Sequence, residues 1–166
     1  MKKVIMDTSP LIFIAKAGLI NFLKRCYRKV YVTRSVIREF EAPRLAGFKA
    51  PEIDVIKNSG ILAKADLTAK QIQLAKKLSK SKNIGIGEAE SGILFKSGGY
   101  ENVIVADERA RRKLKEEGIE AVDLVDFGYV VAQKRWMNIR VFAQKLYEKG
   151  HYRTQRIRNI LGLHRD

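Results

Sequence analysis

The sequence has little of what several protein classes require. Its 166 residues include one cysteine, Cys26, so the chain can form no internal disulfide and no thiolate metal cluster. It contains no run near the roughly 18 apolar residues of a membrane span, and the first residues lack the pattern of a secretory signal. The two histidines, His151 and His164, have no spacing that suggests a metal pair. We therefore expect a soluble, cytoplasmic protein.

Acidic residues are also scarce relative to basic ones. The chain has 33 Lys and Arg against 18 Asp and Glu, a formal net charge of +15. The surplus is uneven, since six basic residues and no acid lie between Asp7 and Arg38, and the segment from Gln133 onward is strongly basic. The charged surface of a heat-stable protein is an alternative explanation, but such a surface would be expected to carry Lys and Glu in similar numbers. The surplus instead favours a partner with a phosphate backbone, bound more weakly as salt rises.

Short apolar runs alternate with helix-like patterns along the chain. Runs rich in β-branched residues predict strands at 3–6, 30–32, 61–62, 102–106 and 119–122. Helical spacing of apolar residues predicts helices between and after them. This alternation favours an α/β fold in which helices cover both faces of a parallel sheet. In such sheets the ligand site lies beyond the carboxyl ends of the strands.

Turn-forming residues set several of the predicted boundaries. Thr33 caps a helix that Pro43 is expected to end, and Thr68 caps a later one. Ser79 to Gly87 is predicted to be a basic loop, with the next helix beginning at Glu88. The length and a hydrophobic content of 46% fit one domain with a sizeable core.

Four acids stand out in this basic background: Asp7, Glu39, Glu88 and Asp107. Asp7 and Asp107 directly follow predicted strands, whereas the other two fall in helix-like stretches. Each has an ordinary structural explanation, because Asp caps helices, Glu in a first turn complements the helix dipole, and an exposed Glu is common. Together they suggest a pocket of oxygen ligands for Mg²⁺ or Mn²⁺, which would support phosphodiester hydrolysis.

The segments around the four acids resemble the motifs of PIN-domain proteins. The first runs from Val4 to Ile12, the second from Val36 to Phe40, the third is Gly87-Glu88-Ala89-Glu90, and the fourth runs from Val103 to Arg111. They occur in the right order, and the chain looks closest to the prokaryotic branch related to VapC-type toxins. The resemblance implies a three-layer α/β/α sandwich with a central parallel sheet and a metal-dependent endoribonuclease.

The resemblance also implies a role for individual residues. The catalytic acids would be Asp7, Glu39, Glu88 and Asp107, with Mg²⁺ or Mn²⁺ held by Asp7, Glu88 and Asp107. A hydroxyl, from Thr8 or Ser9, would support the first acid or bind substrate. Glu90 and Glu108 are reserve ligands, and Glu41 is a weaker substitute for Glu39.

Two arginines after the fourth acid are candidates for substrate binding. Arg109 and Arg112 share a helix face at i, i+3 and could contact RNA phosphates. Pairing with acids of the same helix is an equally good explanation. The family resemblance divides the chain into a PIN-like catalytic domain at 1–132 and a basic helical extension at 133–166, packed on the same domain.

Some features depart from the resemblance and keep alternatives open. Many toxin-type members carry Thr two residues before the fourth acid, where this chain has Val105. One alternative is an RNA-binding protein or subunit with the same fold and no turnover. Another is an HAD-like phosphatase, whose second Asp would stand where this chain has Ser9. The expected partner is RNA, and an antitoxin protein and a second copy of the chain are candidate protein partners.

Overall fold

A parallel sheet of five strands forms the centre of the molecule, and the computed structural model describes residues 2–163. The strands are β1 Val4–Met6, β2 Val30–Thr33, β3 Leu62–Ala65, β4 Asn102–Ile104 and β5 Ala121–Val122. Their order in the sheet is β3-β2-β1-β4-β5. His164 and the other terminal residues of the predicted extension lie outside the described part of the chain.

The sheet changes its direction of growth beside β1. From β1 the chain adds β2 and then β3 on one side, whereas β4 and β5 lie on the other side. Val4 is in register with both Val30 and Asn102, and Met6 is in register with Ile104. Ligands of open parallel sheets bind where the strand order reverses, outside the carboxyl ends of the strands. Here that point lies between β1 and β4, the strands that precede Asp7 and Asp107.

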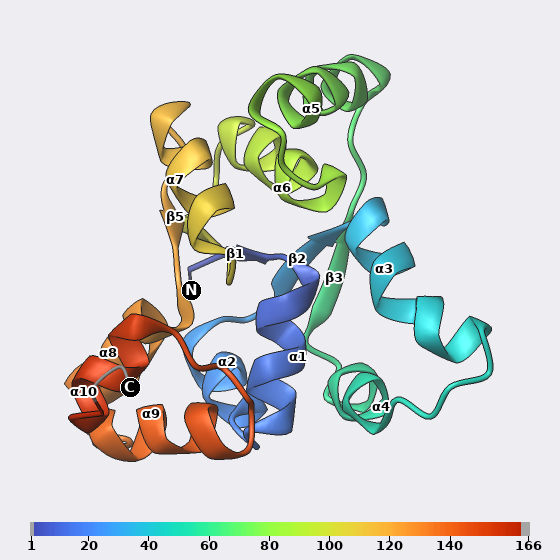
Figure 1. Cartoon of the computed structure of the whole chain (residues 1–166). Helices are drawn as coiled ribbons and strands as arrows, with labels where there is room; N and C mark the ends of the chain where they lie inside the picture. The colour runs from blue at the N-terminus through green and yellow to red at the C-terminus, as the bar shows by residue number, and fades with distance from the viewer. Residues whose placement is uncertain (1, 164–166) are drawn as a thin grey trace.

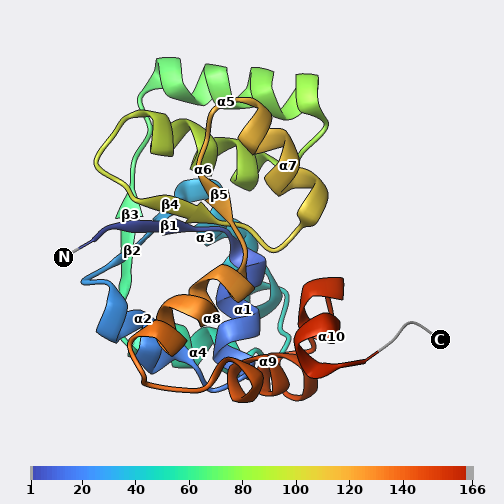
Figure 2. The ribbon, with the colours of Figure 1, turned by 90° about the vertical axis from the view of Figure 1, so that its left-hand side faces the viewer.

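Ten helices surround the sheet within the described residues: α1 Thr8–Lys16, α2 Ile20–Cys26, α3 Arg34–Leu45, α4 Pro51–Asn58, α5 Ala69–Lys82, α6 Ile86–Lys96, α7 Glu108–Glu116, α8 Leu124–Gln133, α9 Ile139–Glu148 and α10 Gln155–Leu161. Helices α5, α6 and α7 lie on one side of the sheet, and α1, α2, α8 and α9 lie on the other (Figures 1 and 2). None of the described helices is long and apolar enough to cross a membrane.

Alternation along β1 gives the molecule two cores. Val4 and Met6 are buried with α1, α2, α8 and α9, whereas Ile5 is buried with α5, α6 and α7. Successive side chains of a strand point to opposite faces, so a strand covered on both faces is apolar throughout. All three residues are fully buried. The predicted three-layer α/β/α sandwich with a parallel sheet is confirmed.

Two predicted helix boundaries were wrong. Pro43 does not end α3, which continues to Leu45, because a proline in the last turn removes only one backbone hydrogen bond. The predicted loop from Ser79 to Gly87 is mostly helical, since α5 continues to Lys82 and α6 begins at Ile86. Asn83, in the left-handed conformation with φ of 53°, ends α5. Gly87 therefore lies inside α6 rather than before it.

The basic segment after Gln133 packs against the rest of the molecule. Phe142 and Leu146 of α9 and Ile157 of α10 are fully buried in the core that contains Val4 and Met6. Arg156 of α10 donates to Asp123, which precedes α8 and is 1% exposed, at 2.8 Å. These contacts join α10 to the carboxyl end of β5 through both apolar packing and a charged hydrogen bond.

Candidate active site

The carboxylate of Asp7 is buried at the carboxyl end of the central strand. Its backbone N–H donates to the carbonyl oxygen of Ile104 at 3.2 Å, which fixes it beside β4. The residue is 7% exposed, and its Oδ1 atom has no hydrogen-bond partner among the described residues. Asp7 occupies the cap position of α1, yet its side chain makes no capping bond. The structural explanation considered for Asp7 therefore leaves its side chain unaccounted for, since buried carboxylates normally have partners.

The environment of Asp7 disfavours its charge. Burial raises the pKa of Asp7 from 3.8 to about 7, only partly offset by the backbone N–H of Thr8. The carboxylates of Glu88, Glu39 and Asp107 raise it further. Like charges act in this way only when they are close together. The fold thus brings the four acids selected from the sequence into one neighbourhood.

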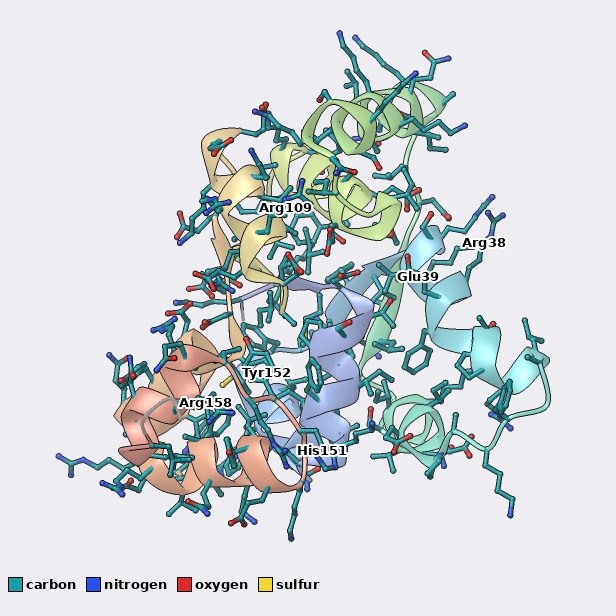
Figure 3. All side chains as sticks on the ribbon, in the orientation of Figure 1. Arg38, Glu39, Arg109, His151, Tyr152 and Arg158 are labelled. Carbon is teal, nitrogen blue, oxygen red and sulfur yellow. The ribbon has the colours of Figure 1, made fainter. Side chains whose placement is uncertain are left out.

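Glu39 approaches Asp7 from α3. The hydroxyl of Thr8 donates to Glu39 Oε2 at 3.1 Å, so the start of α1 holds this carboxylate in place. A Cβ atom on Gly87 would lie 3.2 Å from Asp7 Oδ1 and 3.3 Å from Glu39 Oε1. The two carboxylates therefore flank the backbone of α6 where it has no side chain. Figure 3 shows Glu39 and Arg109 on opposite sides of the start of α1.

Gly87→Ala tests this close approach. The added methyl group would crowd both carboxylates, so we expect affinity for Mn²⁺ to fall at least ~10-fold, a loss of about 1.4 kcal/mol. Alanine is favoured over glycine inside a helix by about 0.5–1 kcal/mol, so the melting temperature should stay within a few degrees. Calorimetric titration with Mn²⁺ and thermal melting measure the two effects. Unchanged Mn²⁺ affinity would mean that the Asp7 carboxylate does not bind metal beside α6.

Glu88 enters from the first turn of α6. Its Oε2 atom accepts a hydrogen bond from the backbone N–H of Gly85, the N-cap residue of α6, at 2.9 Å. Burial raises the pKa of Glu88; the Gly85 N–H opposes that shift, the carboxylates of Asp107 and Glu39 add to it, and Arg109 opposes it. Glu88 thus combines the structural role considered for it with proximity to the other acids.

Asp107 lies before α7, beyond the end of β4. Its Oδ1 accepts a hydrogen bond from the backbone N–H of Ala110 at 2.7 Å, so the helix-cap explanation holds for one of its oxygens. Asp107 is exposed, in contrast to Asp7. It therefore forms the open side of the acidic cluster.

The reserve acids have other positions. Glu90 is buried and accepts hydrogen bonds from the hydroxyl of Ser35 at 2.8 Å and from its backbone N–H at 3.3 Å. It therefore joins α6 to α3. Glu108 is exposed in the first turn of α7, and Glu41 pairs with Lys57 at 2.5 Å.

Basic side chains border the acidic cluster. Arg109 donates to the carbonyl oxygen of Asn83 at 3.1 Å and lies near enough to Glu88 to affect its pKa. Arg112 and Ser9 are exposed, and Thr8 is half-buried. Arg34 and Arg38, which were not predicted as binding residues, line a groove of about 500 Å³ between α3, α5 and α6. Their i, i+4 spacing beside Glu39 was the available signal.

The donor set fits a hard divalent cation. It consists of carboxylate oxygens, which Mg²⁺ and Mn²⁺ prefer, and it includes the buried Oδ1 of Asp7 that lacks a partner. Within residues 2–163, however, no three His, Cys, Asp or Glu side chains are already arranged to hold an ion. Closing the set around a cation would therefore require movement of side chains such as Glu88 and Asp107.

A family model described as a PIN domain matches residues 3–159. The chain belongs to the PIN-domain family. The match extends through α9 and into α10, and it argues against the phosphatase alternative. No curated protein matches the chain.

A solved structure supports the same fold for this PIN-domain chain. The crystal structure of PAE2754 from Pyrobaculum aerophilum is similar with a TM-score of 0.58 and 13% identity, over 80% of this chain and 98% of that chain. At this identity the likeness concerns the fold alone. PIN domains are in general nucleases that act on nucleic acids, so the acidic cluster lies on a nuclease-type fold.

Proposed function

We propose that this PIN domain is an endoribonuclease that depends on Mg²⁺ or Mn²⁺ and hydrolyses RNA phosphodiester bonds. The observation that carries the proposal is the buried Asp7 carboxylate, whose Oδ1 atom lacks a hydrogen-bond partner within residues 2–163 and whose pKa is raised by Glu39, Glu88 and Asp107. Such a cluster disfavours its own ionisation unless positive charge is brought to it. The net charge of +15 supports a polyanionic substrate.

Asp7, Glu88 and Asp107 would hold the cation, and Glu39 would complete the catalytic group. A bound divalent cation would supply an activated water for attack and would stabilise charge on the leaving oxygen. Thr8 positions Glu39 through its hydroxyl, which donates to Oε2. Burial of Asp7 keeps its carboxylate away from bulk solvent.

The basic residues near the cluster would hold the RNA backbone. Arg109 and Arg112 of α7, with Ser9 at the start of α1, would contact phosphates on one side of the cluster. Arg34 and Arg38 would contact the RNA strand along the groove between α3, α5 and α6. The experiment measures cleavage of single-stranded RNA by the wild-type protein with Mn²⁺, by the wild-type protein without metal, and by Asp7→Asn with Mn²⁺. Equal cleavage in all three conditions would contradict the proposal.

A finer proposal is that the ribonuclease acts as a toxin with an antitoxin protein as partner. Its support is the resemblance of the four motifs to VapC-type toxins. Expression in a bacterium should then arrest growth, and Asp7→Asn should relieve the arrest. Normal growth with abundant soluble wild-type protein would contradict the toxin role.

A homodimer is a separate proposal, and a monomer mass measured by light scattering would contradict it.

The alternative is an RNA-binding protein or subunit without turnover. Two observations favour it: Glu88 already caps α6, and Val105 stands where many toxin-type members have Thr. This alternative predicts RNA binding that does not require metal and no cleavage in Mn²⁺. Cleavage that Asp7→Asn abolishes would rule it out.

A further inference from the structure

A second basic surface lies at the edge of the sheet opposite to the acidic cluster. In Figure 2 the chain enters β1 from the N-terminal side and leaves it toward α1, so the amino ends of the strands form the far edge. We call this surface the amino-edge surface, and its cations are Lys2, Lys3, Arg25, Arg28, Lys29 and Lys134. Lys3 and Asp7 are four residues apart, which is about 13 Å along an extended strand.

Two cavities lie on the amino-edge surface. One, of about 430 Å³, is lined by Lys3, Arg28, Lys29 and Tyr31 and by no acid. The other, of about 340 Å³, includes Lys2, Arg25, Cys26 and Lys134 in its lining, with Glu101 as its single acid. The two cavities have no lining residue in common; Lys3 lines the first and Lys2 the second, so they lie on either side of the chain where it enters β1.

Most of these cations have no anionic partner. Lys2 pairs with Glu101 at 2.5 Å, and the Lys29 amine donates to the carbonyl oxygen of Gly60 at 2.6 Å. Across residues 2–163, no carboxylate lies within salt-bridge distance of the other four. A cluster of unpaired like charges is unfavourable alone and is relieved by a polyanion.

Aromatic rings hold several of the cations in place. The Arg25 guanidinium lies 3.8 Å from the centre of the Trp136 ring, and the Lys134 amine lies 5.3 Å from it. The Lys3 amine lies 5.5 Å from the centre of the Tyr31 ring. These contacts restrain long side chains without neutralising their charge, so less entropy is lost when an anion binds.

One uncharged group at this surface also lacks a partner. Asn102 lines the second cavity, and its Oδ1 atom is buried with no hydrogen-bond partner in the part of the chain that the structure describes. An amide oxygen accepts hydrogen bonds, and the amine of a base or the hydroxyl of a ribose is a suitable donor. A nucleotide chain carries such donors together with phosphates.

We infer that the amino-edge surface binds a single-stranded segment of nucleic acid, with phosphates on the cations and a base or ribose donor on Asn102. This inference rests on the proposed RNA ligand but not on cleavage. An RNA strand held there would extend around the molecule from the acidic cluster. Single-stranded binding of this kind depends on backbone charge and should therefore weaken with salt.

Cys26 provides a direct probe, because it is the single cysteine of the chain and lines the second cavity. The experiment measures alkylation of Cys26 by iodoacetamide in the Asp7→Asn protein, with and without a short single-stranded RNA. Burial raises the pKa of the Cys26 thiol, so the reaction is run at mildly alkaline pH. We expect RNA to slow alkylation at least ~10-fold at low salt, with recovery at high salt.

Matched charge reversals locate the effect. Arg28→Glu with Lys134→Glu places one reversal in each cavity and should abolish protection. The slope of the logarithm of the RNA-binding constant against the logarithm of salt concentration should become smaller in magnitude by about 1 to 2. Lys77→Glu with Lys115→Glu makes the same charge change at exposed positions on α5 and α7 and should leave protection intact.

Three outcomes would overturn the inference. They are alkylation at the free rate in saturating RNA, equal loss of protection in the two charge-reversed proteins, and equal protection by inorganic phosphate at the same phosphate concentration. Cleavage by the wild-type protein is measured separately. Protection of Cys26 without any cleavage would therefore overturn the proposed ribonuclease activity while supporting the amino-edge surface.

Discussion

Asp7→Asn is expected to lower RNA cleavage on the order of 100- to 1,000-fold or more while RNA affinity stays equal or rises. The substitution keeps the size of the side chain and removes one charged oxygen ligand from the centre of the acidic cluster. It also removes a negative charge near the path of the phosphate backbone, which should favour RNA binding. Cleavage of end-labelled RNA in Mn²⁺ and filter binding measure the two effects.

Glu120→Gln is the matched control for that variant. It also removes one negative charge, but from an exposed residue between α7 and β5. It should cleave at the wild-type rate, which separates loss of a ligand from a change in net charge. Wild-type cleavage by Asp7→Asn would show that the acidic cluster is not the catalytic centre.

Asp7→Asn is also expected to stabilise the metal-free protein at alkaline pH. Because the pKa of Asp7 is raised from 3.8 to about 7, ionisation of this carboxyl destabilises the fold. The penalty is absent below about pH 4, grows up to about pH 7 and is constant above it, at most on the order of 4 kcal/mol. For a chain of this size, Asp7→Asn should raise the melting temperature at pH 8 on the order of 5–10 °C.

Comparison of two pH values tests the cause of that stabilisation. At pH 4 the two proteins should melt within a few degrees of each other, because this pH is close to the unfolded-state pKa of 3.8, where most of the penalty is absent. Mn²⁺ should raise the melting temperature of the wild type at pH 8 more than that of Asp7→Asn. Equal melting temperatures at pH 8 in metal-free buffer would contradict the claim that the ionised Asp7 carboxylate destabilises the fold.

Local sequence was sufficient to predict the strands and the position of two acids. Val4–Met6 and the run before Asp107 are short and rich in buried apolar residues, so the sheet and its carboxyl edge could be inferred from pattern alone. The prediction of Glu39 and Glu88 rested more on the family resemblance. Their helices meet Asp7 only through the packing of α3 and α6, which no local pattern specifies.

Other features depend on contacts between distant segments. Gly87 lies inside α6 because α5 ends at Asn83, which adopts the left-handed conformation. Glycine is the residue that usually adopts this conformation, so the glycines of this segment were the stronger sequence signal for a loop. The amino-edge surface joins residues 2–3, 25–29 and 134, which are far apart in the sequence. The basic surplus is visible in the sequence, but only the fold brings these residues to one edge of the sheet.

The most direct test of the acidic cluster is diffraction from a crystal soaked in Mn²⁺. Anomalous scattering locates the metal without reference to activity. We expect one or two peaks bounded by carboxylate oxygens of Asp7, Glu88 and Asp107, with metal–oxygen distances of about 2.0–2.3 Å. Peaks at other sites, with no metal density between these three carboxylates at saturating Mn²⁺, would contradict the central claim.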